Sequence, residues 1–308
     1  MKQCLAIWHY PHRTLLENVA FFADNGFDAV SVGGAHMYQA CCDEQVADAL
    51  AELLKNKGTP MTVHYKLPSS HTAEDVADFE KFVRAVGAWQ KKHGLIHILS
   101  FDVYDAIRDN IRPYVDFVLK EVPDSMIAVE DFGLTARERT QVAHLLGNPR
   151  FGYLVDIGHL YIRIKGLNQE NKALFTNSPD ECPACDHPGL AEVRRAFASK
   201  EFPIVEIHLH GNNGVDDQHL FLEDGELDIS KMIARYVVDA SGKVKETQLV
   251  FSMAMDSDVS DEETDEVTTL GLIYDYDMTV KVKATGNKVK ISYPSFSGFA
   301  AVDPDELG

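Results

Sequence analysis

The stretch that decides the fold covers residues 61–101 and reads MTVHYKLPSSHTAEDVADFEKFVRAVGAWQKKHGLIHILSF. It holds a short apolar run at 61–64, a helical pattern at 73–92 with its apolar residues on one face, and a second apolar run at 95–101. Two parallel strands of one sheet need a connection of this length, which is usually a helix. The stretch therefore predicts a strand–helix–strand unit.

The same alternation extends over residues 1–255. Six more apolar runs have the length of strands: 5–8, 29–32, 127–130, 153–156, 204–208 and 249–251. Helical patterns, such as those at 14–26 and 43–57, separate most of the runs. Eight such units in about 250 residues predict an α/β fold closed into a (β/α)8 TIM barrel. A doubly wound open sheet is the rival, but no Gly-rich dinucleotide-binding motif follows the first run.

Residues 256–308 differ from the barrel in pattern. Positions 256–266 hold seven acidic residues, a run that we expect to be solvated. Positions 278–293 alternate apolar and polar residues around Thr285-Gly286-Asn287-Lys288, which predicts an antiparallel hairpin. We therefore divide the chain into a TIM barrel at 1–255 and, at 256–308, a C-terminal acidic segment with a β-hairpin extension.

The charge balance restricts the partners of the chain. Its formal net charge is −19 and its pI is about 5.0, which opposes non-specific binding to nucleic acid or to an anionic membrane. No stretch approaches the ~18 apolar residues that cross a bilayer, and the first nine residues turn polar too soon for a signal peptide. We therefore expect a cytoplasmic protein with a small-molecule partner and with its five cysteines reduced.

Residue types that bind metals lie at the ends of the strand runs. Four runs end in such a residue: His64, Glu130, Asp156 and His208. Further candidates follow the sixth and seventh runs: His159, Asp217 and His219. The carboxyl ends of the strands of a parallel barrel face one common mouth. Imidazoles and carboxylates are ligands of zinc, manganese, cobalt and iron, so the set predicts a divalent-metal site there.

The two carboxylates of this set need a partner. Glu130 and Asp156 end apolar runs, where an unpaired carboxylate carries a large desolvation cost. Metal coordination removes that cost, and so would an ion pair with Arg or Lys, but the strand-end runs contain no basic residue of that kind. A single histidine such as His64 is also explained as a hydrogen-bonded structural residue. The prediction of a metal site therefore depends on the whole set.

Three motifs resemble strand-end signatures of the xylose-isomerase-like superfamily, which includes sugar isomerases and epimerases, inosose dehydratases and the apurinic endonucleases. They are Val129-Glu130-Asp131-Phe132, Asp156-Ile157-Gly158-His159, and His208-Leu209-His210-Gly211 followed by Asp217-Gln218-His219. The resemblance covers residues 1–255 and implies a TIM barrel with Glu130, Asp156 and His208 as core metal ligands. It also implies that His159, Asp217 and His219 bind further metals, as in the endonucleases, or contact the substrate, as in the sugar enzymes.

The resemblance implies catalytic roles as well. In the epimerases, two strand-end glutamates exchange a proton at the carbon next to a carbonyl, and the metal polarises that carbonyl and stabilises the enediolate. Glu130 matches one of these glutamates, and His64 resembles the third-strand histidine of the superfamily, so we predict both as catalytic residues. The eighth run departs from the pattern, because Ser252 stands where the second glutamate belongs.

Two other motifs are weaker candidates for metal binding. His97 lies early in the fourth run, which favours a structural role, whereas Asp102 at the end of that run is better placed for the mouth. The cysteine pair at 182–185, with His187 nearby, lacks a second pair at zinc-binding spacing, which favours incidental thiols in a loop. The motif lies in the long connection at 160–187, and long loops at this end of a barrel usually cover the active site.

We predict an enzyme that depends on zinc, manganese, cobalt or magnesium and acts on a sugar, sugar phosphate or polyol as an isomerase, epimerase or dehydratase. A phosphodiester hydrolase of the apurinic-endonuclease type is one alternative. The histidine-rich ligand set favours it, and the acidic charge opposes a DNA substrate. A catalytically silent barrel that serves as a binding module is another, because the eighth-run glutamate is missing.

A chain shortened to residues 1–255 tests the division into two parts. We expect it to stay folded and to unfold in one cooperative transition, because residues 256–308 follow the eighth strand and carry twelve acidic residues against four lysines. Thermal unfolding followed by circular dichroism measures this. An insoluble product, or one without a cooperative transition, would show that the extension belongs to the barrel.

Overall fold

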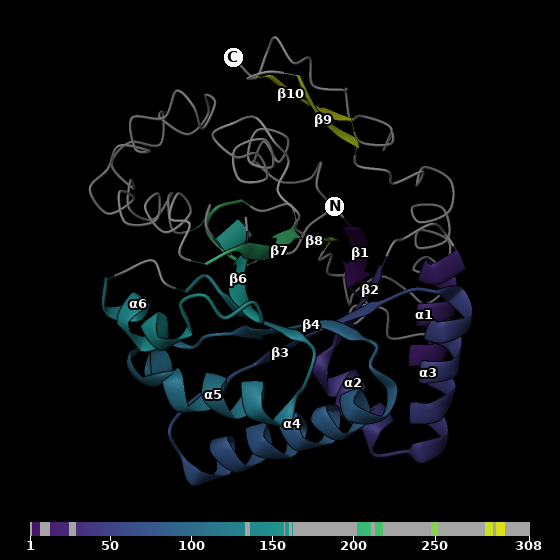
Figure 1. Cartoon of the computed structure of the whole chain (residues 1–308), viewed down its shortest axis with the longest axis horizontal. Helices are drawn as coiled ribbons and strands as arrows, with labels where there is room; N and C mark the ends of the chain where they lie inside the picture. The colour runs from purple at the N-terminus through teal and green to yellow at the C-terminus, as the bar shows by residue number, and fades with distance from the viewer. Residues whose placement is uncertain are drawn as a thin grey trace.

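Eight parallel strands form a closed barrel in the computed structural model (Figure 1). Each strand pairs with the next along the chain, and β8 pairs with β1 to close the ring. The strands are β1 (Lys2–Ala6), β2 (Ala29–Gly33), β3 (Met61–Lys66), β4 (Ile96–Asp102), β5 (Met126–Glu130), β6 (Phe151–Asp156), β7 (Ile204–Leu209) and β8 (Gln248–Phe251). The structure describes residues 2–6, 13–24, 29–132, 136–156, 158–159, 162, 202–210, 213–217, 248–251, 281–285 and 288–292.

Helices cover the outside of the strands in the described part of the chain. They are α1 (Leu15–Asp24), α2 (Gly34–Cys41), α3 (Glu44–Lys57), α4 (Ala73–His93), α5 (Arg112–Glu121) and α6 (Ala136–Val142), with short 3-10 helices at Asp105–Asn110 and Ala143–Leu145. Figure 1 shows α2, α4 and α5 on the outer side of β3 and β4. No helix among the described residues is long and apolar enough to span a membrane.

The two longest helices begin and end where their sequences supply caps. Asp43 accepts hydrogen bonds from the backbone N–H groups of Gln45 and Val46 at 3.0 and 3.2 Å, which satisfies free donors at the start of α3. Gly58 ends the same helix at φ +65°, a left-handed conformation that glycine adopts at little cost. Thr72 and Gly94 cap α4 in the same way. The predicted helices at 43–57 and 73–92 therefore match the observed ones closely.

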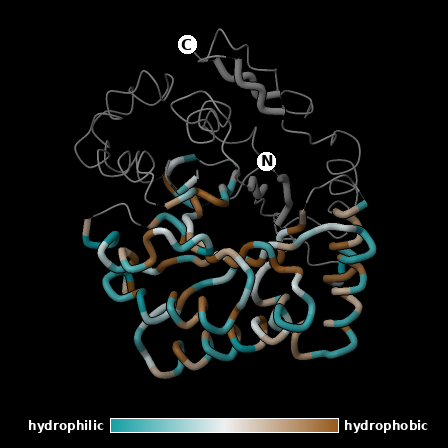
Figure 2. Tube along the Cα trace, viewed as in Figure 1, coloured by the Kyte–Doolittle hydropathy of each residue, from teal (hydrophilic) through white to brown (hydrophobic). Residues whose placement is uncertain are grey.

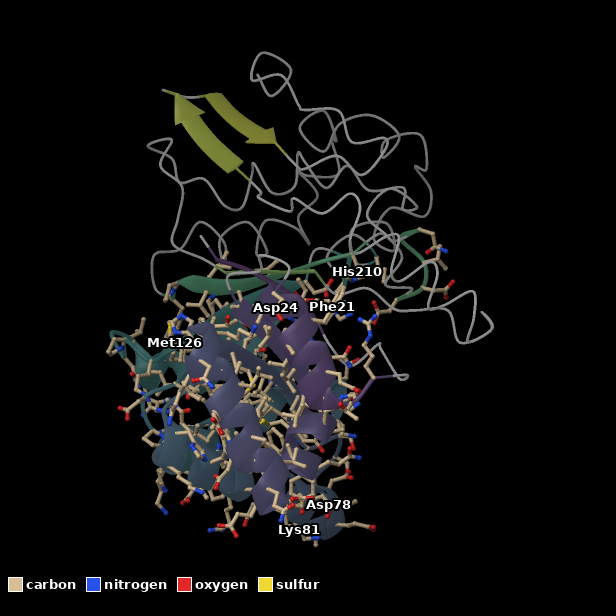
Figure 3. The ribbon with its side chains drawn as sticks, turned by 90° about the vertical axis from the view of Figure 1, so that its right-hand side faces the viewer. Phe21, Asp24, Asp78, Lys81, Met126 and His210 are labelled. Atoms are coloured by element: carbon tan, nitrogen blue, oxygen red, sulfur yellow. The ribbon has the colours of Figure 1, made fainter. Side chains whose placement is uncertain are left out.

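Buried apolar side chains form a large core between the strands and the helices. Coloured by hydropathy, the chain trace shows hydrophobic and hydrophilic positions interleaved along the helices (Figure 2). On α4, Phe79, Phe82 and Val83 are buried against this core. Asp78 and Lys81 lie on the exposed face of the same helix, with Lys81 Nζ 2.8 Å from Asp78 Oδ1 (Figure 3). This separation of faces is the amphipathic pattern that the sequence shows.

A smaller apolar group lies on the other faces of the strands: Ile98, Ala128, Leu154 and Val205, with Met126 packed against it. Ala128 and Leu154 each precede a strand-end carboxylate, Glu130 and Asp156, by two positions. Side chains two apart on a strand point to the same face. The apolar group therefore lies one layer below the polar residues at the strand ends.

The predicted (β/α)8 barrel is confirmed, and the open sheet is wrong because β8 pairs with β1. The predicted hairpin strands also pair, since β9 (Lys281–Thr285) runs antiparallel to β10 (Lys288–Ser292). One helix, α2, was not predicted: Gly33 at its N-cap makes no side-chain hydrogen bond, so the usual start signal is missing. The acidic run at 256–266 and the cysteine motif at 182–185 lie outside the described residues, and the boundary at 255 stays a prediction.

Candidate metal centre at the barrel mouth

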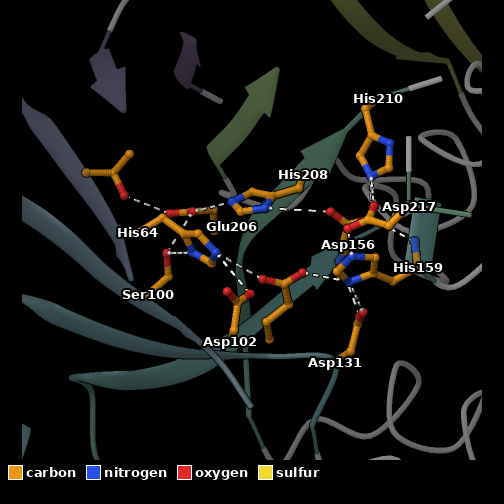
Figure 4. Close-up of polar contacts among 12 residues, drawn as sticks. His64, Ser100, Asp102, Asp131, Asp156, His159, Glu206, His208, His210 and Asp217 are labelled. Carbon is orange, nitrogen blue, oxygen red and sulfur yellow. Dashed lines mark hydrogen bonds and ion pairs between the residues drawn. The ribbon is translucent and has the colours of Figure 1, made fainter. Parts of the chain in front are cut away.

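The carboxyl ends of β3 to β7 surround a cavity of about 520 Å³. Each of these strands presents one side chain with a metal-ligand atom to it: His64, Asp102, Glu130, Asp156 and His208. Figure 4 labels four of them, His64, Asp102, Asp156 and His208. The other described residues that line the cavity are Val103, Tyr104, Asp105, Arg108, Asp131, His159 and Asp217. The cavity thus collects side chains from five strands and from the segments that follow them.

His64, Glu130 and His208 form a first group with the geometry of metal ligands. Their ligand atoms lie within 4.8 Å of one another. His64 Nε2 is 3.3 Å from Glu130 Oε2, and the two imidazole rings meet edge to face with centroids 4.7 Å apart. Glu130 Oε2 is buried and accepts no hydrogen bond from the described residues. A buried oxygen without a donor is costly, and a cation beside it would offset that cost.

Glu130, Asp131 and His159 form a second group, whose ligand atoms also lie within 4.8 Å of one another. His159 Nδ1 is 2.9 Å from Glu130 Oε1 and 3.2 Å from Asp131 Oδ2. On the other side of the ring, His159 Nε2 is 3.1 Å from Asp217 Oδ2. Glu130 belongs to both groups, with one carboxylate oxygen facing each of them.

Asp156 lies next to the first group and is fully buried. Its Oδ1 accepts a hydrogen bond from the backbone N–H of His159 at 2.9 Å and lies 2.9 Å from His210 Nε2. Its Oδ2 has no hydrogen-bond partner among the described residues and lies 3.7 Å from His208 Nδ1. One oxygen of Asp156 is therefore fixed by hydrogen bonds, while the other is left for a cation near His208.

The glycine of the motif Asp156-Ile157-Gly158-His159 makes room for His210. A Cβ on Gly158 would lie 2.1 Å from the nearest ring atom of His210, far inside van der Waals contact. His210 is fully buried and contacts Asp156 from this position. The glycine is required by this close approach, which the sequence alone did not reveal.

The ionisable groups at the mouth shift one another's pKa values. Burial raises the pKa of Glu130 well above its usual range, and the nearby Asp102 carboxylate raises it further. Burial alone would lower the pKa values of His159 and His208, but the surrounding carboxylates, Asp156 first among them, raise both. Burial alone would raise the pKa of Asp156, but the neighbouring imidazoles hold it well below its usual range. Protons thus compensate the clustered carboxylates, and a divalent ion would compete with those protons.

Asp131 is a residue of the site that the sequence reasoning did not single out. Its φ of +43° is unfavourable for a residue with a side chain. Three hydrogen bonds hold this conformation: its N–H donates to Leu154 O at 3.1 Å, its C=O accepts from Arg108 Nη1 at 3.1 Å, and its Oδ1 accepts from the N–H of Asp156 at 3.2 Å. The strained backbone directs Oδ2 towards His159. The sequence signal that could have identified Asp131 as a site residue was its position directly after Glu130.

The structure brings together six of the seven predicted site residues: His64, Glu130, Asp156, His159, His208 and Asp217. The seventh, His219, and the eighth-run residue Ser252 lie outside the described residues. His97 is exposed near the start of β4, and Asp102 at the end of that strand lines the cavity. Glu206, two positions before His208, was missed as part of the site. His210, two positions after His208, was noted in the seventh-strand motif but was not among the predicted ligands.

No protein-family model and no curated protein matches the sequence. Solved structures match most of the chain at low sequence identity. A xylose isomerase domain containing protein from Salmonella typhimurium is 13% identical with a TM-score of 0.56, over 88% of this chain and 97% of that chain. The probable 3-DHS dehydratase from Bacillus anthracis is 13% identical with a TM-score of 0.53, over 88% and 99%. D-psicose 3-epimerase from Clostridium cellulolyticum is 10% identical with a TM-score of 0.50, over 89% and 90%.

At such identities the likeness defines the fold. Two proteins with a xylose isomerase domain match over 88–89% of this chain and 97–98% of theirs. The chain therefore has the TIM-barrel fold of these proteins, as predicted.

The substitution Gly158→Ala tests the close approach between Gly158 and His210. We expect a loss of about 1–3 kcal/mol in the free energy of unfolding, because the added methyl group must displace a buried ring, together with weaker zinc binding as Asp156 loses its support. Chemical unfolding and zinc titration measure the two effects. Gly147→Ala is the control, since Gly147 has φ +79° and open space around it: it should lose stability through backbone strain and keep its zinc affinity. Equal zinc affinity in both variants would show that His210 does not support the site.

Proposed function

We propose that the protein is a divalent-metal-dependent isomerase, epimerase or dehydratase that transfers a proton on a sugar or polyol. The observation that carries the proposal is the group of His64, Glu130 and His208, whose ligand atoms lie within 4.8 Å at the mouth of a xylose isomerase-like barrel. A buried oxygen of Glu130 faces this group without a hydrogen-bond donor among the described residues.

The residues at the mouth fit a divalent ion. His64, Glu130 and His208 would hold it, and Asp156 Oδ2, 3.7 Å from His208 Nδ1, offers a further ligand oxygen. A mixed set of imidazoles and carboxylates favours zinc, manganese or cobalt over magnesium. When bound, such an ion polarises a carbonyl of the substrate and stabilises the negative charge that develops as a neighbouring C–H proton leaves.

Glu130 is the proposed acid/base. Its side chain is 4% exposed, and burial raises its pKa above the ordinary range of a glutamate. A raised pKa is common in carboxylates that act as general acids and bases. His64 Nε2 lies 3.3 Å from Oε2 of the Glu130 carboxylate. Asp102, 3.1 Å from the same nitrogen and 40% exposed, is the described carboxylate best placed to serve as the second acid/base in place of the missing eighth-strand glutamate.

The cavity suits a small polar molecule. A volume of about 520 Å³ is in the range of small-molecule sites. Six of its twelve described lining residues are acidic, and Arg108 is the single lysine or arginine among them. This field disfavours a polyanion such as nucleic acid. The names of the similar structures, a 3-DHS dehydratase and a D-psicose 3-epimerase, support a small polyhydroxylated substrate.

A metal-dependent phosphodiester hydrolase is the second candidate, and the second ligand group favours it. Glu130, Asp131 and His159 lie beside the first group and share Glu130 with it. Two ions bridged by one carboxylate activate a water and neutralise a phosphate in enzymes of that class.

The substitution Glu130→Gln separates these candidates. For a proton-transfer enzyme, we expect it to abolish exchange of a substrate C–H proton with deuterated water, because an amide cannot accept the proton. Exchange is measured by NMR on a panel of ketoses, aldoses and cyclic polyols, with the protein loaded with manganese or zinc. Glu121→Gln, at the C-terminal end of α5, is the matched control, and this variant should catalyse the exchange at the wild-type rate.

The exchange assay, together with an assay on a generic phosphodiester, distinguishes the alternative functions. A phosphodiester hydrolase would show no C–H exchange and would cleave a generic phosphodiester, with that cleavage lost in Glu130→Gln. A wild-type protein without either activity would favour a binding module. Exchange that persists in Glu130→Gln would show that the acid/base is a different residue.

A further inference from the structure

Beneath the candidate metal centre, the layer of side chains in the barrel interior is apolar on β5 and β6 and polar on β3, β4 and β7. Thr62 on β3, Ser100 on β4 and Glu206 on β7 are all fully buried. Glu206 accepts hydrogen bonds from Thr62 Oγ1 at 2.9 Å and from Ser100 Oγ at 3.0 Å. A buried carboxylate is costly, so its presence where apolar residues usually fill a barrel calls for a role.

The third contact of Glu206 is His208 of the first ligand group. His208 Nε2 lies 2.9 Å from Glu206 Oε1, the same oxygen that Ser100 contacts (Figure 4). An ionised carboxylate only accepts hydrogen bonds, so His208 must carry a proton on Nε2. Its other nitrogen, Nδ1, then faces the mouth, 3.7 Å from Asp156 Oδ2.

Glu206 also reaches His64, through Ser100. The hydroxyl of Ser100 has one hydrogen, which goes to Glu206, so its oxygen accepts a hydrogen bond from His64 Nδ1 at 3.0 Å. This leaves Nε2 of His64 directed at Asp102 Oδ1 and Glu130 Oε2, at 3.1 and 3.3 Å. When that nitrogen carries no proton, it is itself an acceptor that faces two carboxylate oxygens. A cation between these three atoms would remove their mutual repulsion.

We infer that Glu206 is a positioning residue that selects which ring nitrogen of His64 and of His208 presents its lone pair to a metal ion. One buried carboxylate, acting directly on His208 and through Ser100 on His64, points Nδ1 of one ring and Nε2 of the other into the same group. Partners of this kind fix the ring orientation of metal-binding histidines and typically change metal affinity 10–100-fold when removed. The inference rests on the metal site of the proposed function.

The substitution Glu206→Gln tests this role with little change in side-chain shape. An amide donates as well as accepts, so the hydrogen bonds to Ser100 and His208 no longer have one required direction. We expect zinc to bind about 10–100-fold more weakly, measured by competition with a chromophoric chelator. In the zinc-loaded wild type, ¹⁵N-histidine NMR should show a protected Nε2–H on His208 and Nδ1–H on His64; both signals should weaken or shift in Glu206→Gln.

Two further variants separate positioning from general stability. Ser100→Ala cuts the link to His64 alone, so the His64 signal should change while the Nε2–H of His208 stays. Ser125→Ala is the control for burial, because Ser125 is also fully buried and donates to Ile96 O at 2.9 Å, at the start of β5 and away from the mouth. It should lose stability and keep the wild-type zinc affinity and both histidine signals.

The outcomes distinguish the two proposals. A wild-type protein that binds neither zinc nor manganese overturns the proposed metal site itself. A wild-type protein that binds zinc, together with a Glu206→Gln variant of equal affinity and unchanged histidine signals, overturns the role of Glu206 alone. If Glu206→Gln does not fold, the Ser100→Ala variant is the test. An unchanged His64 signal together with wild-type zinc affinity would show that Glu206 does not act on His64 through Ser100.

Discussion

The pairing of β8 with β1 is the constraint on which the rest of the structure depends. Because all eight strands run in the same direction around the closed ring, their carboxyl ends meet at one mouth. Residues as far apart in the chain as His64 and His208 thereby come within ligand distance of Glu130. Alternation along each strand then directs every second side chain inward, which stacks the apolar group of Ala128 and Leu154 beneath the polar residues.

The second determinant is the charge that this convergence buries. Carboxylates from β5, β6 and β7 lie within the barrel at Glu130, Asp156 and Glu206, each at most 3% exposed. Imidazoles compensate part of this charge, and serine and threonine hydroxyls solvate Glu206. Glu130 Oε2 and Asp156 Oδ2 stay without hydrogen bonds among the described residues. The remaining negative charge is thus concentrated where the proposed ion would bind. The hydrogen bonds of Glu206, in the layer beneath, orient the histidines of that site.

Much of the fold and part of the site could be predicted from the sequence. Eight apolar runs gave the strands, and the carboxyl-end rule for parallel barrels then placed His64, Glu130, Asp156 and His208 at one mouth. Contacts that depend on tertiary packing were out of reach, such as the close approach of His210 to Gly158 and the hydrogen bonds of Glu206. Helix α2 was missed because Gly33 provides no side-chain cap, so its start has no local signal.

Metal content at the barrel mouth is the most direct measurement of the central claim. Elemental analysis of the purified protein, followed by zinc and manganese titration and anomalous diffraction from a crystal, determines whether an ion binds and where. The proposed centre predicts an ion beside Glu130, Asp156 and His208, and a stabilisation of about 2.7 kcal/mol when the free ion is present at 100 times its Kd. Protein without bound metal that gains no stability from either ion would contradict a metal-dependent function.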